Sequence, residues 1–306
     1  MNALTNRQMR LFLALAQTGS VSAAARLMHI TQPTASMQLR EITSTVGMPL
    51  YEIISRKVRL TEAGLELART VRLVAEEWDQ FAQRIDAMKG LRRGRLRVAI
   101  VSTAEYFVPR LVGSFCRRHP DIEVSLEVQN RDGVMRRLRE GLDDLYVMSM
   151  PPEDIELDDQ VFMANPLVLI VATGDPLLRS AAPLALSALS SQRFILRESG
   201  SGTRMAVDRY FRRRGFRPRV RLELGSNEAV KEAVAGGLGL GVVSRHTLHG
   251  REREDGVAVL QVDGFPVNSS WHVVHPRARQ VSPIAAAFRE HLLSGEPAGR
   301  RSPRAG

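Results

Sequence analysis

The feature that most constrains this chain is a run of apolar residues between positions 67 and 88. They follow one another at steps of four, three, four, three, four and three, which is the heptad alternation of one helical stripe. A helix from Thr61 to about Lys89 would be roughly 40 Å long, more than the diameter of a small domain. The narrow stripe with charged flanks favours a dimerisation surface over a helix that lies on its own domain. The stripe consists of Leu67, Val71, Val74, Trp78, Phe81, Ile85 and Met88.

Length and charge narrow the choice of protein class. A chain of 306 residues is longer than one core usually supports, so we expect more than one domain. The 43 Lys plus Arg outnumber the 33 Asp plus Glu and give a net charge of +10, which suits a polyanion such as nucleic acid but also an ordinary basic protein.

The sequence also predicts a compartment. A single cysteine, Cys116, excludes an internal disulfide framework and favours the reducing cytoplasm. The apolar stretch from Leu11 to Ala16 is shorter than the core of a signal peptide, and no run reaches the roughly 18 residues of a membrane span. We therefore expect neither export nor a membrane partner.

Two short helices joined by a three-residue turn are predicted before residue 47. The second begins at Thr31, and Pro33 lies in its first turn, where a missing N–H costs nothing. Its apolar residues form one buried stripe and leave polar groups on the opposite face. This arrangement is typical of a helix-turn-helix that reads the DNA major groove, although a solvated helix face is the alternative. Gln32, Ser36 and Arg40 lie on that face with Met37 beside them, and Met37 or Thr34 could contact a thymine methyl group.

The next segment, LYEIISRKVRLTEAG, predicts two short strands around a turn at Arg56 and Lys57. Such a hairpin is a wing that can place Arg56 against the DNA backbone or in the minor groove. Residues 1–60 contain seven basic and two acidic side chains. The positive charge therefore lies where the DNA reader is expected.

After a basic linker at 90–97, strand and helix patterns alternate. Residues 96–150 predict a βαβαβ set, residues 166–244 a second set, and residues 270–293 a strand and helix that could return to the first lobe. The predicted fold class is α/β, with an all-α winged helix-turn-helix domain (1–60) and a linker helix (61–90) before two α/β lobes (about 91–162 plus 269–295, and 163–268). We expect the tail, 296–306, to be disordered.

Two strand ends carry groups suited to an anionic ligand, since open parallel sheets bind ligands at the carboxyl ends of their strands. Ser102 and Thr103 follow the first strand of the α/β part. Residues 200–203 offer N–H groups and hydroxyls at a helix start, which favours an anion, although a capped Gly-Ser loop is the alternative. The predicted site residues are Ser102, Thr103, Arg197, Gly200, Ser201, Gly202 and Thr203. We interpret the seven arginines between positions 209 and 221 as a solvated surface.

Catalytic and metal-binding motifs are missing from the sequence. SGSG lacks the first glycine of GxSxG, and GGLGLG lacks the spacing of GxGxxG. The histidine pairs 246/249 and 272/275 do not have zinc-ligand spacing. An enzyme built on the α/β part is one alternative, and the missing motifs argue against it. We therefore expect no catalytic activity, no metal and no resident cofactor. An exported solute receptor is the other alternative, and the helix-turn-helix pattern opposes it.

Several segments resemble the LysR-type transcriptional regulators, and within them the RuBisCO-operon (Calvin-cycle) type. The segments are HITQPTASMQLREI, VGMPLYE, GRLRVAIVSTAEYFVPRLVGSFCRRHPDIEVSLEVQNRDGV, LRESGSGTR and RLELGSNEAVKEAVAGGLGL. The resemblance implies a winged helix, a linker helix and two periplasmic-binding-protein-like subdomains, usually in a tetramer.

The resemblance also implies roles for individual residues. It places Gln32, Pro33 and Ser36 at base-reading or groove positions and Arg56 on the wing, and we include Thr31, the helix cap, in the same DNA-facing set. Position 37 is often Arg in the family, and Met37 here removes that contact. Positions matching Ser102, Thr103, Asn130 and Ser201 to Thr203 hold a small effector in the family.

The function implied is activation of a carbon-fixation operon in response to a phosphorylated metabolite. Implied effectors are ribulose bisphosphate or another sugar phosphate, phosphoglycolate, phosphoenolpyruvate and NADPH. The alternative is a LysR-type regulator of another metabolic operon that responds to a non-phosphorylated organic acid. Expected partners are promoter DNA, further copies of the chain and RNA polymerase.

Overall fold

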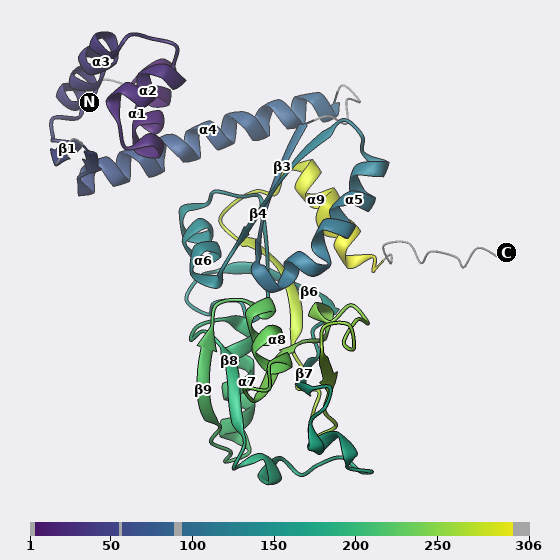
Figure 1. Cartoon of the computed structure of the whole chain (residues 1–306). Helices are drawn as coiled ribbons and strands as arrows, with labels where there is room; N and C mark the ends of the chain where they lie inside the picture. Colours follow the sequence, from purple (N-terminus) through teal and green to yellow (C-terminus); the bar gives the residue numbers. More distant parts are fainter. Residues whose placement is uncertain (1–3, 55–56, 89–93, 296–306) are drawn as a thin grey trace. The chain divides into compact units, whose positions relative to one another are not determined.

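The computed structural model describes residues 4–54, 57–88 and 94–295, apart from the side chains of residues 76, 83, 84 and 86–88. Contacts divide the chain into two units, Met1–Ile85 and Asp86–Gly306, which can be followed by colour in Figure 1. The predicted wing tip at Arg56, the side chain of Met88, part of the basic linker and the tail lie outside the described residues. Within them, no helix is long and apolar enough to cross a membrane.

The first unit is a three-helix core with a β-hairpin. The Thr5 hydroxyl accepts from the Gln8 main-chain N–H while the Gln8 side chain accepts from the Thr5 N–H, which is a capping box that fixes the start of the first helix. Leu11, Phe12 and Leu39 are fully buried at the centre of the core. The elements are α1 (Asn6–Thr18), α2 (Val21–Leu27), α3 (Gln32–Val46), β1 (Tyr51–Ile54), β2 (Lys57–Leu60) and α4 (Glu62–Met88).

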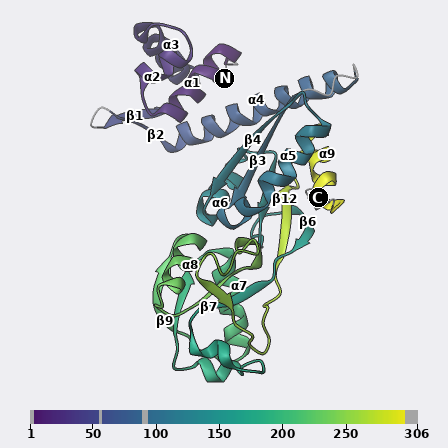
Figure 2. The same cartoon turned by 45° about the vertical axis from the view of Figure 1, so that its right-hand side comes forward.

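The second unit contains two α/β lobes, as the sequence predicts. The first lobe has a five-stranded sheet of order β4-β3-β5-β12-β6, with α6 on one side and α5 and α9 on the other (Figures 1 and 2). Its elements are β3 (Gly94–Val101), the 3₁₀ turn η1 (Ser102–Tyr106), α5 (Val108–Arg118), β4 (Ile122–Gln129), α6 (Arg131–Glu140), β5 (Leu145–Met148), β6 (Leu157–Ala164), β12 (Ser270–Pro276) and α9 (Pro283–Leu293).

The second lobe has a five-stranded sheet of order β11-β7-β10-β8-β9. Alternate residues of one strand enter different cores, because Leu169 packs with Phe211 on one face and Ile170 with Val230 on the other. The helices α7 and α8 therefore cover opposite faces. The elements are β7 (Leu167–Ala172), η2 (Pro176–Arg179), η3 (Leu186–Leu189), β8 (Arg193–Arg197), α7 (Gly202–Arg213), β9 (Arg219–Leu224), α8 (Asn227–Ala235), β10 (Leu240–Ser244), η4 (Arg245–Thr247) and β11 (Val257–Val259).

Both sheets are mixed, whereas the βαβ patterns predicted parallel sheets. β12 runs antiparallel to β5 and β6, and β7 runs antiparallel to β10 and β11. The chain crosses between the lobes twice, at 165–166 and 268–269, and the two crossovers lie side by side. Asn165 N–H donates to Ser269 O, and Leu167 and Val267 exchange two main-chain hydrogen bonds, all at 2.9 Å. These paired crossovers form the hinge between the lobes.

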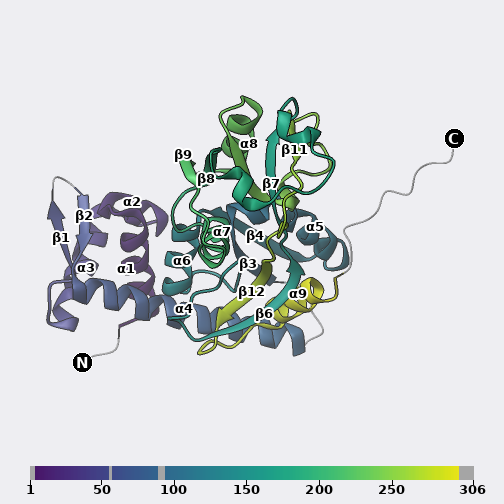
Figure 3. The ribbon, with the colours of Figure 1, turned by 90° about the horizontal axis from the view of Figure 1, so that it is seen from below.

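The parallel strands of both lobes end near the junction between them. β3, β4 and β5 end at Val101, Gln129 and Met148 in the first lobe, and β8 and β9 end at Arg197 and Leu224 in the second. Figure 3, seen from below, shows the second lobe with α7 and α8 drawn over the first lobe with α6, β3 and β4. This topology brings the predicted effector residues of the two lobes together.

Candidate DNA-reading surface and effector cleft

The polar face of α3 is exposed as the spacing predicts. Gln32, Pro33 and Arg40 are exposed and Met37 is 54% exposed, while Ala35, Leu39 and Ile42 on the opposite face are fully buried. The helix therefore presents an amide, a thioether and a guanidinium group on one surface, and Ser36 is half-buried beside them. An α-helix that exposes such groups fits the B-DNA major groove.

The start of α3 is fixed by its own hydroxyl groups. Thr31 Oγ1 accepts from the Thr34 main-chain N–H at 3.4 Å and lies 2.8 Å from Thr34 Oγ1. Thr34 is half-buried, and its hydroxyl is engaged with that of the cap residue. Arg40 is exposed and has no ion-pair partner among the described residues.

The apolar stripe of α4 has two parts. Leu67 packs against the core of the first unit and Val71 is buried, whereas Trp78 is 63% exposed and Phe81 is 49% exposed. The rings of Trp78 and Phe81 meet edge to face with centroids 5.8 Å apart. Together with Leu73 and Val74 they line a groove of about 500 Å³. Leu73 lies outside the predicted heptad stripe. The exposed part is therefore an apolar surface without a partner in its own unit among the described residues.

The Thr103 side chain of the first lobe is hydrogen-bonded to two residues of the second lobe. Its hydroxyl oxygen accepts from Arg197 Nη1 at 3.2 Å and from Asn227 Nδ2 at 3.0 Å. Arg197 Nη1 also donates to Asn227 Oδ1 at 3.0 Å, and all three side chains are buried. The structure therefore brings together Thr103 and Arg197, both predicted as effector-site residues, and joins them to each other.

The charge of Arg197 is balanced by its neighbour in the chain. Its Nε and Nη2 donate to the two carboxylate oxygens of Glu198 at 2.7 and 2.9 Å, and Nη2 also donates to Gly225 O. This fork-to-fork pair holds the guanidinium group in one orientation. Arg197 is thus a bridge between the lobes whose donors are already in use.

A second bridge lies beside the first. The Tyr106 hydroxyl, in the first lobe, donates to Glu228 Oε1 on α8 at 2.7 Å. Burial, followed by this hydrogen bond to a carboxylate, raises the pKa of the Tyr106 phenol well above its usual range. Tyr106 is therefore neutral and remains a hydrogen-bond donor to Glu228 at any physiological pH.

The start of α7, where the sequence predicts an anion site or a capped Gly-Ser loop, is capped by Ser201. Ser201 accepts from the Arg204 main-chain N–H at 3.1 Å, and both Ser201 and Thr203 are buried. Gly202 lies so close to the first lobe that a Cβ atom there would stand 3.1 Å from Ser149 O. The N-terminus of α7 therefore faces the carboxyl end of β5. Gly200 is exposed, with a φ of 88° that favours glycine.

Arg131 reaches the same carbonyl group from the first lobe. Its Nη1 donates to Ser149 O at 3.0 Å, and burial lowers the pKa of its guanidinium. This is the one hydrogen bond of the Arg131 guanidinium group to the described residues, and Asp132 next to it in the chain offsets part of the effect of burial. Asn130, the residue before Arg131, is exposed and caps α6, because its Oδ1 accepts from Gly133 N–H at 2.9 Å. Ser102 is half-buried.

Sequence reasoning missed Arg131, Ser149 and Asn227 at this site. Each follows a strand within a few residues, so the strand-end rule that singled out Ser102 applies to all three. Asn227, directly after the helix cap Ser226, has the signature of an ordinary helix start. Its contact with Thr103 depends on how the lobes meet, and local sequence does not encode that arrangement.

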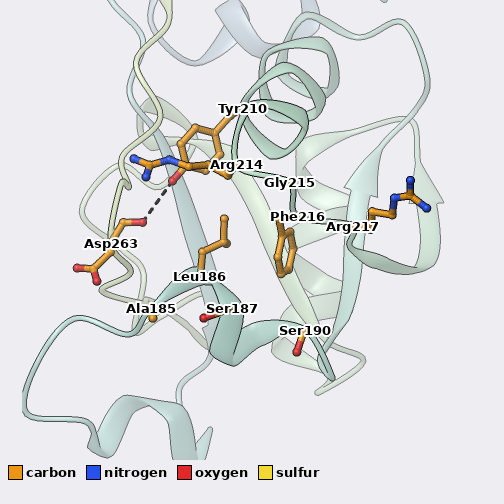
Figure 4. A pocket seen from close by; sticks show the side chains of 10 residues that line it. All are labelled: Ala185, Leu186, Ser187, Ser190, Tyr210, Arg214, Gly215, Phe216, Arg217 and Asp263. Atoms are coloured by element: carbon orange, nitrogen blue, oxygen red, sulfur yellow. Dashed lines mark hydrogen bonds between the residues drawn. The ribbon is translucent and has the colours of Figure 1, made fainter.

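One pocket of the second unit lies apart from these strand ends. A pocket of about 680 Å³ lies at the end of α7, where Figure 4 shows Leu186 and Phe216 facing its interior while the Arg217 guanidinium points outward.

In the described part of the chain, no group of three or more His, Cys, Asp or Glu side chains could hold a metal ion. His272 is bound to Asp159 at 2.6 Å, and His246 to Ala164 O at 2.9 Å.

Comparison with known proteins identifies both units. The model of the bacterial regulatory helix-turn-helix protein, lysR family, matches residues 6–65, and that of the LysR substrate binding domain matches residues 89–296. The HTH-type transcriptional activator CmpR of Synechocystis is 39% identical over 97% of this chain and 98% of its own length. A RuBisCO operon transcriptional regulator of Allochromatium vinosum is 40% identical over 94% of this chain and 95% of its own.

A solved structure extends the comparison to the second unit. The regulatory domain of CcmR from Synechocystis, in complex with 2-PG, is 44% identical, with a TM-score of 0.63 over 66% of this chain and 97% of that domain. The predicted family and fold are confirmed, and the chain is a regulator and not an enzyme. A reading helix, a long connecting helix and two α/β lobes in this order, together with these matches, show that the chain belongs to the LysR family of transcriptional regulators.

Proposed function

We propose that this regulator activates a carbon-fixation operon when a phosphorylated metabolite binds between its two lobes. The observation that carries the proposal is its 44% identity to the CcmR regulatory domain, whose structure contains 2-PG. Relatives named as RuBisCO operon regulators, at 38–40% identity over nearly the whole chain, support the operon class. The cytoplasm is the compartment in which such a protein would meet both DNA and metabolite.

The groups at the strand ends fit an oxygen-rich anion. The N-terminus of α7, with Ser201 and Thr203, supplies main-chain N–H groups and hydroxyls, and Arg131 supplies a guanidinium group with one polar partner among the described residues. Helix N-termini and arginine side chains are the usual phosphate ligands in proteins. We assign the phosphate to this side, with Ser102 and Asn130 contributing from the first lobe.

A non-phosphorylated organic acid is the second candidate. It is favoured by the pairing of Arg197 with Glu198, which removes one of the two arginines near the strand ends from charge recognition. The guanidinium group of Arg131, with one hydrogen bond to Ser149 O, suits one carboxylate as well as one phosphate. Direct titration separates these candidates.

The effector acts through the orientation of the lobes in this proposal. A ligand that touches both lobes binds one orientation better than others and shifts the population toward it. DNA binding must then change effector affinity by the same factor, because the coupling is reciprocal. The exposed part of the α4 stripe would hold two chains together, and the dimer would present two reading helices to two DNA half-sites. Two such dimers would form a tetramer. The DNA-bound protein would contact RNA polymerase.

Titration calorimetry tests the effector class. Ribulose bisphosphate, phosphoglycolate, phosphoenolpyruvate and NADPH are titrated into the full chain, with malonate as the non-phosphorylated control. Thr203→Val removes a buried hydroxyl at nearly constant size and should weaken binding by about 1–3 kcal/mol, while DNA binding without effector is retained. No heat from any phosphorylated compound, or wild-type affinity in the variant, would refute this assignment.

Base reading by α3 has its own test. Gln32→Ala should cost about 1–3 kcal/mol on the cognate operator and much less on random DNA. Ser44→Ala, also exposed but at the other end of the helix, is the matched control and should bind as the wild type does. Genome-wide mapping of bound sites then asks whether a carbon-fixation operon ranks first.

A further inference from the structure

A cavity of about 420 Å³ lies at the hinge, where the chain returns from the second lobe to the first. Arg209 and Arg213 of α7 form one wall, and residues 266–270 of the returning crossover form another. Met150, just after the end of β5, contributes the first lobe. The lining therefore comes from both lobes and from the connection between them, and it is distinct from the strand ends that carry Thr103 and Thr203.

The charge of this cavity is positive and unbalanced. Arg209 and Arg213 are four residues apart and so lie on the same face of α7, and both are exposed. Neither has a hydrogen-bond or ion-pair partner among the described residues. Arg204 on the same helix is different, because it pairs with Asp208 and Glu223 at 3.0 and 2.9 Å. Two like charges held one helical turn apart repel each other, and an anion between them relieves that repulsion.

The other walls offer hydrogen-bond donors. Asn268, Ser269 and Ser270 line the cavity, and their side chains have no partner among the residues that the structure describes. His272 is the one further titratable group in the lining apart from Tyr210, and its Nδ1 is held by Asp159 outside it. No carboxylate side chain belongs to the described lining.

The two walls are fixed relative to each other. Figure 4 shows the Tyr210 hydroxyl donating to the main-chain oxygen of Asp263, at 3.2 Å, which ties α7 to the segment that leads into the returning crossover. Ser269 O accepts from Asn165 N–H at 2.9 Å, so the crossover itself is held by its partner. The arginines and the polar side chains thus face one volume without a large rearrangement.

We propose that this hinge cavity is a second effector site, which binds a small organic anion with two or more negative groups, such as a bisphosphate or a tricarboxylate. Two guanidinium groups and three uncharged polar side chains match two separate anionic groups joined by a polar body. The volume lies in the range of small-molecule sites. Because the ligand would contact α7 of the second lobe and Met150 of the first, its affinity would depend on lobe orientation, and it would adjust the response to the ligand of the cleft.

Calorimetry on the full chain tests this proposal with ribulose 1,5-bisphosphate and citrate as probes. The test variant is the double substitution Arg209→Ala/Arg213→Ala. The control is Arg212→Ala/Arg217→Ala, which removes the same charge from exposed positions outside the cavity. Loss of one charge-assisted hydrogen bond weakens binding about tenfold or more, so the test variant should lose a component of binding at least tenfold while the control retains it.

The outcomes separate this site from the proposed cleft site. A component lost in Arg209→Ala/Arg213→Ala but retained in Thr203→Val belongs to the hinge, whether or not the cleft binds a phosphorylated compound. Equal affinities in the two double variants would overturn the proposal, and so would the absence of any component with either probe that depends on Arg209 and Arg213. If only the cleft assignment is wrong, Thr203→Val binds the phosphorylated compounds with wild-type affinity while the component that depends on Arg209 and Arg213 is still present.

Discussion

Thr103→Val should destabilise the effector domain even when no ligand is bound. In the native structure one hydroxyl oxygen accepts two hydrogen bonds across the lobes, from Arg197 Nη1 at 3.2 Å and from Asn227 Nδ2 at 3.0 Å. Valine has nearly the same volume, so the cavity cost is small and the lost acceptor dominates. Arg197 Nη1 keeps Asn227 Oδ1 at 3.0 Å, whereas Asn227 Nδ2 loses its one acceptor among the described residues.

The expected cost follows from that difference. A buried donor left without a partner costs about 1–3 kcal/mol, and about 2 kcal/mol lowers the Tm of a domain of this size by about 4–8 °C. Thermal unfolding of the full chain, followed by circular dichroism without effector, measures it. Thr103→Ser keeps the acceptor and should recover most of the loss, and Ser102→Ala, at the neighbouring half-buried hydroxyl, should change little. A Tm within 1 °C of the wild type for Thr103→Val would show that the hydroxyl does not hold the lobes together.

Three further predictions concern other parts of the chain. Trp78→Asp places a charge in the exposed apolar stripe of α4 and should release monomers, which light scattering detects as a fall in mass; an unchanged mass would contradict the dimer assignment. Gly202→Ala puts a Cβ atom against Ser149 and should cost about 1–3 kcal/mol in effector binding or stability, and wild-type behaviour in both would show that the approach is not constrained. Burial lowers the pKa of His291, so the unfolded chain binds more protons and stability should fall as pH drops below about 6.5; urea unfolding at pH 7.5 and 5.5 should show a smaller difference in His291→Gln.

The elements predicted correctly are those with strong local patterns. The α3 stripe of Ala35, Leu39 and Ile42 and the continuous apolar strand Leu167–Ala172 need no long-range information. Leu157–Ala164 was missed because it is an edge strand, β6, whose sequence LDDQVFMA mixes charge with apolar residues. The antiparallel members of both sheets were missed because strand direction depends on which distant segment returns to the sheet.

The same difference between local and long-range information applies to the candidate site. The cap at Ser201 and the helix start after it were predictable from Gly, Ser and Thr at one strand end. The hydrogen bonds of Arg197 were not predictable. One partner, Glu198, is its neighbour in the chain, but Thr103 and Asn227 are distant in sequence. A sequence pattern can place a charged group at a strand end, but only the fold shows whether its donors are already used.

The position of β12 in the first sheet has a consequence for how the chain is made. β6 pairs with β12 alone, and β12 also separates β5 from β6. On the ribosome, β6 is complete at residue 164, but β12 is complete only at residue 276, after the whole second lobe. At 5–20 residues per second this interval lasts roughly 6–22 s. The second lobe can therefore reach its native state first, while the first keeps two unpaired strand edges until the last part of synthesis, and that is the period in which a nascent chain would most need a chaperone.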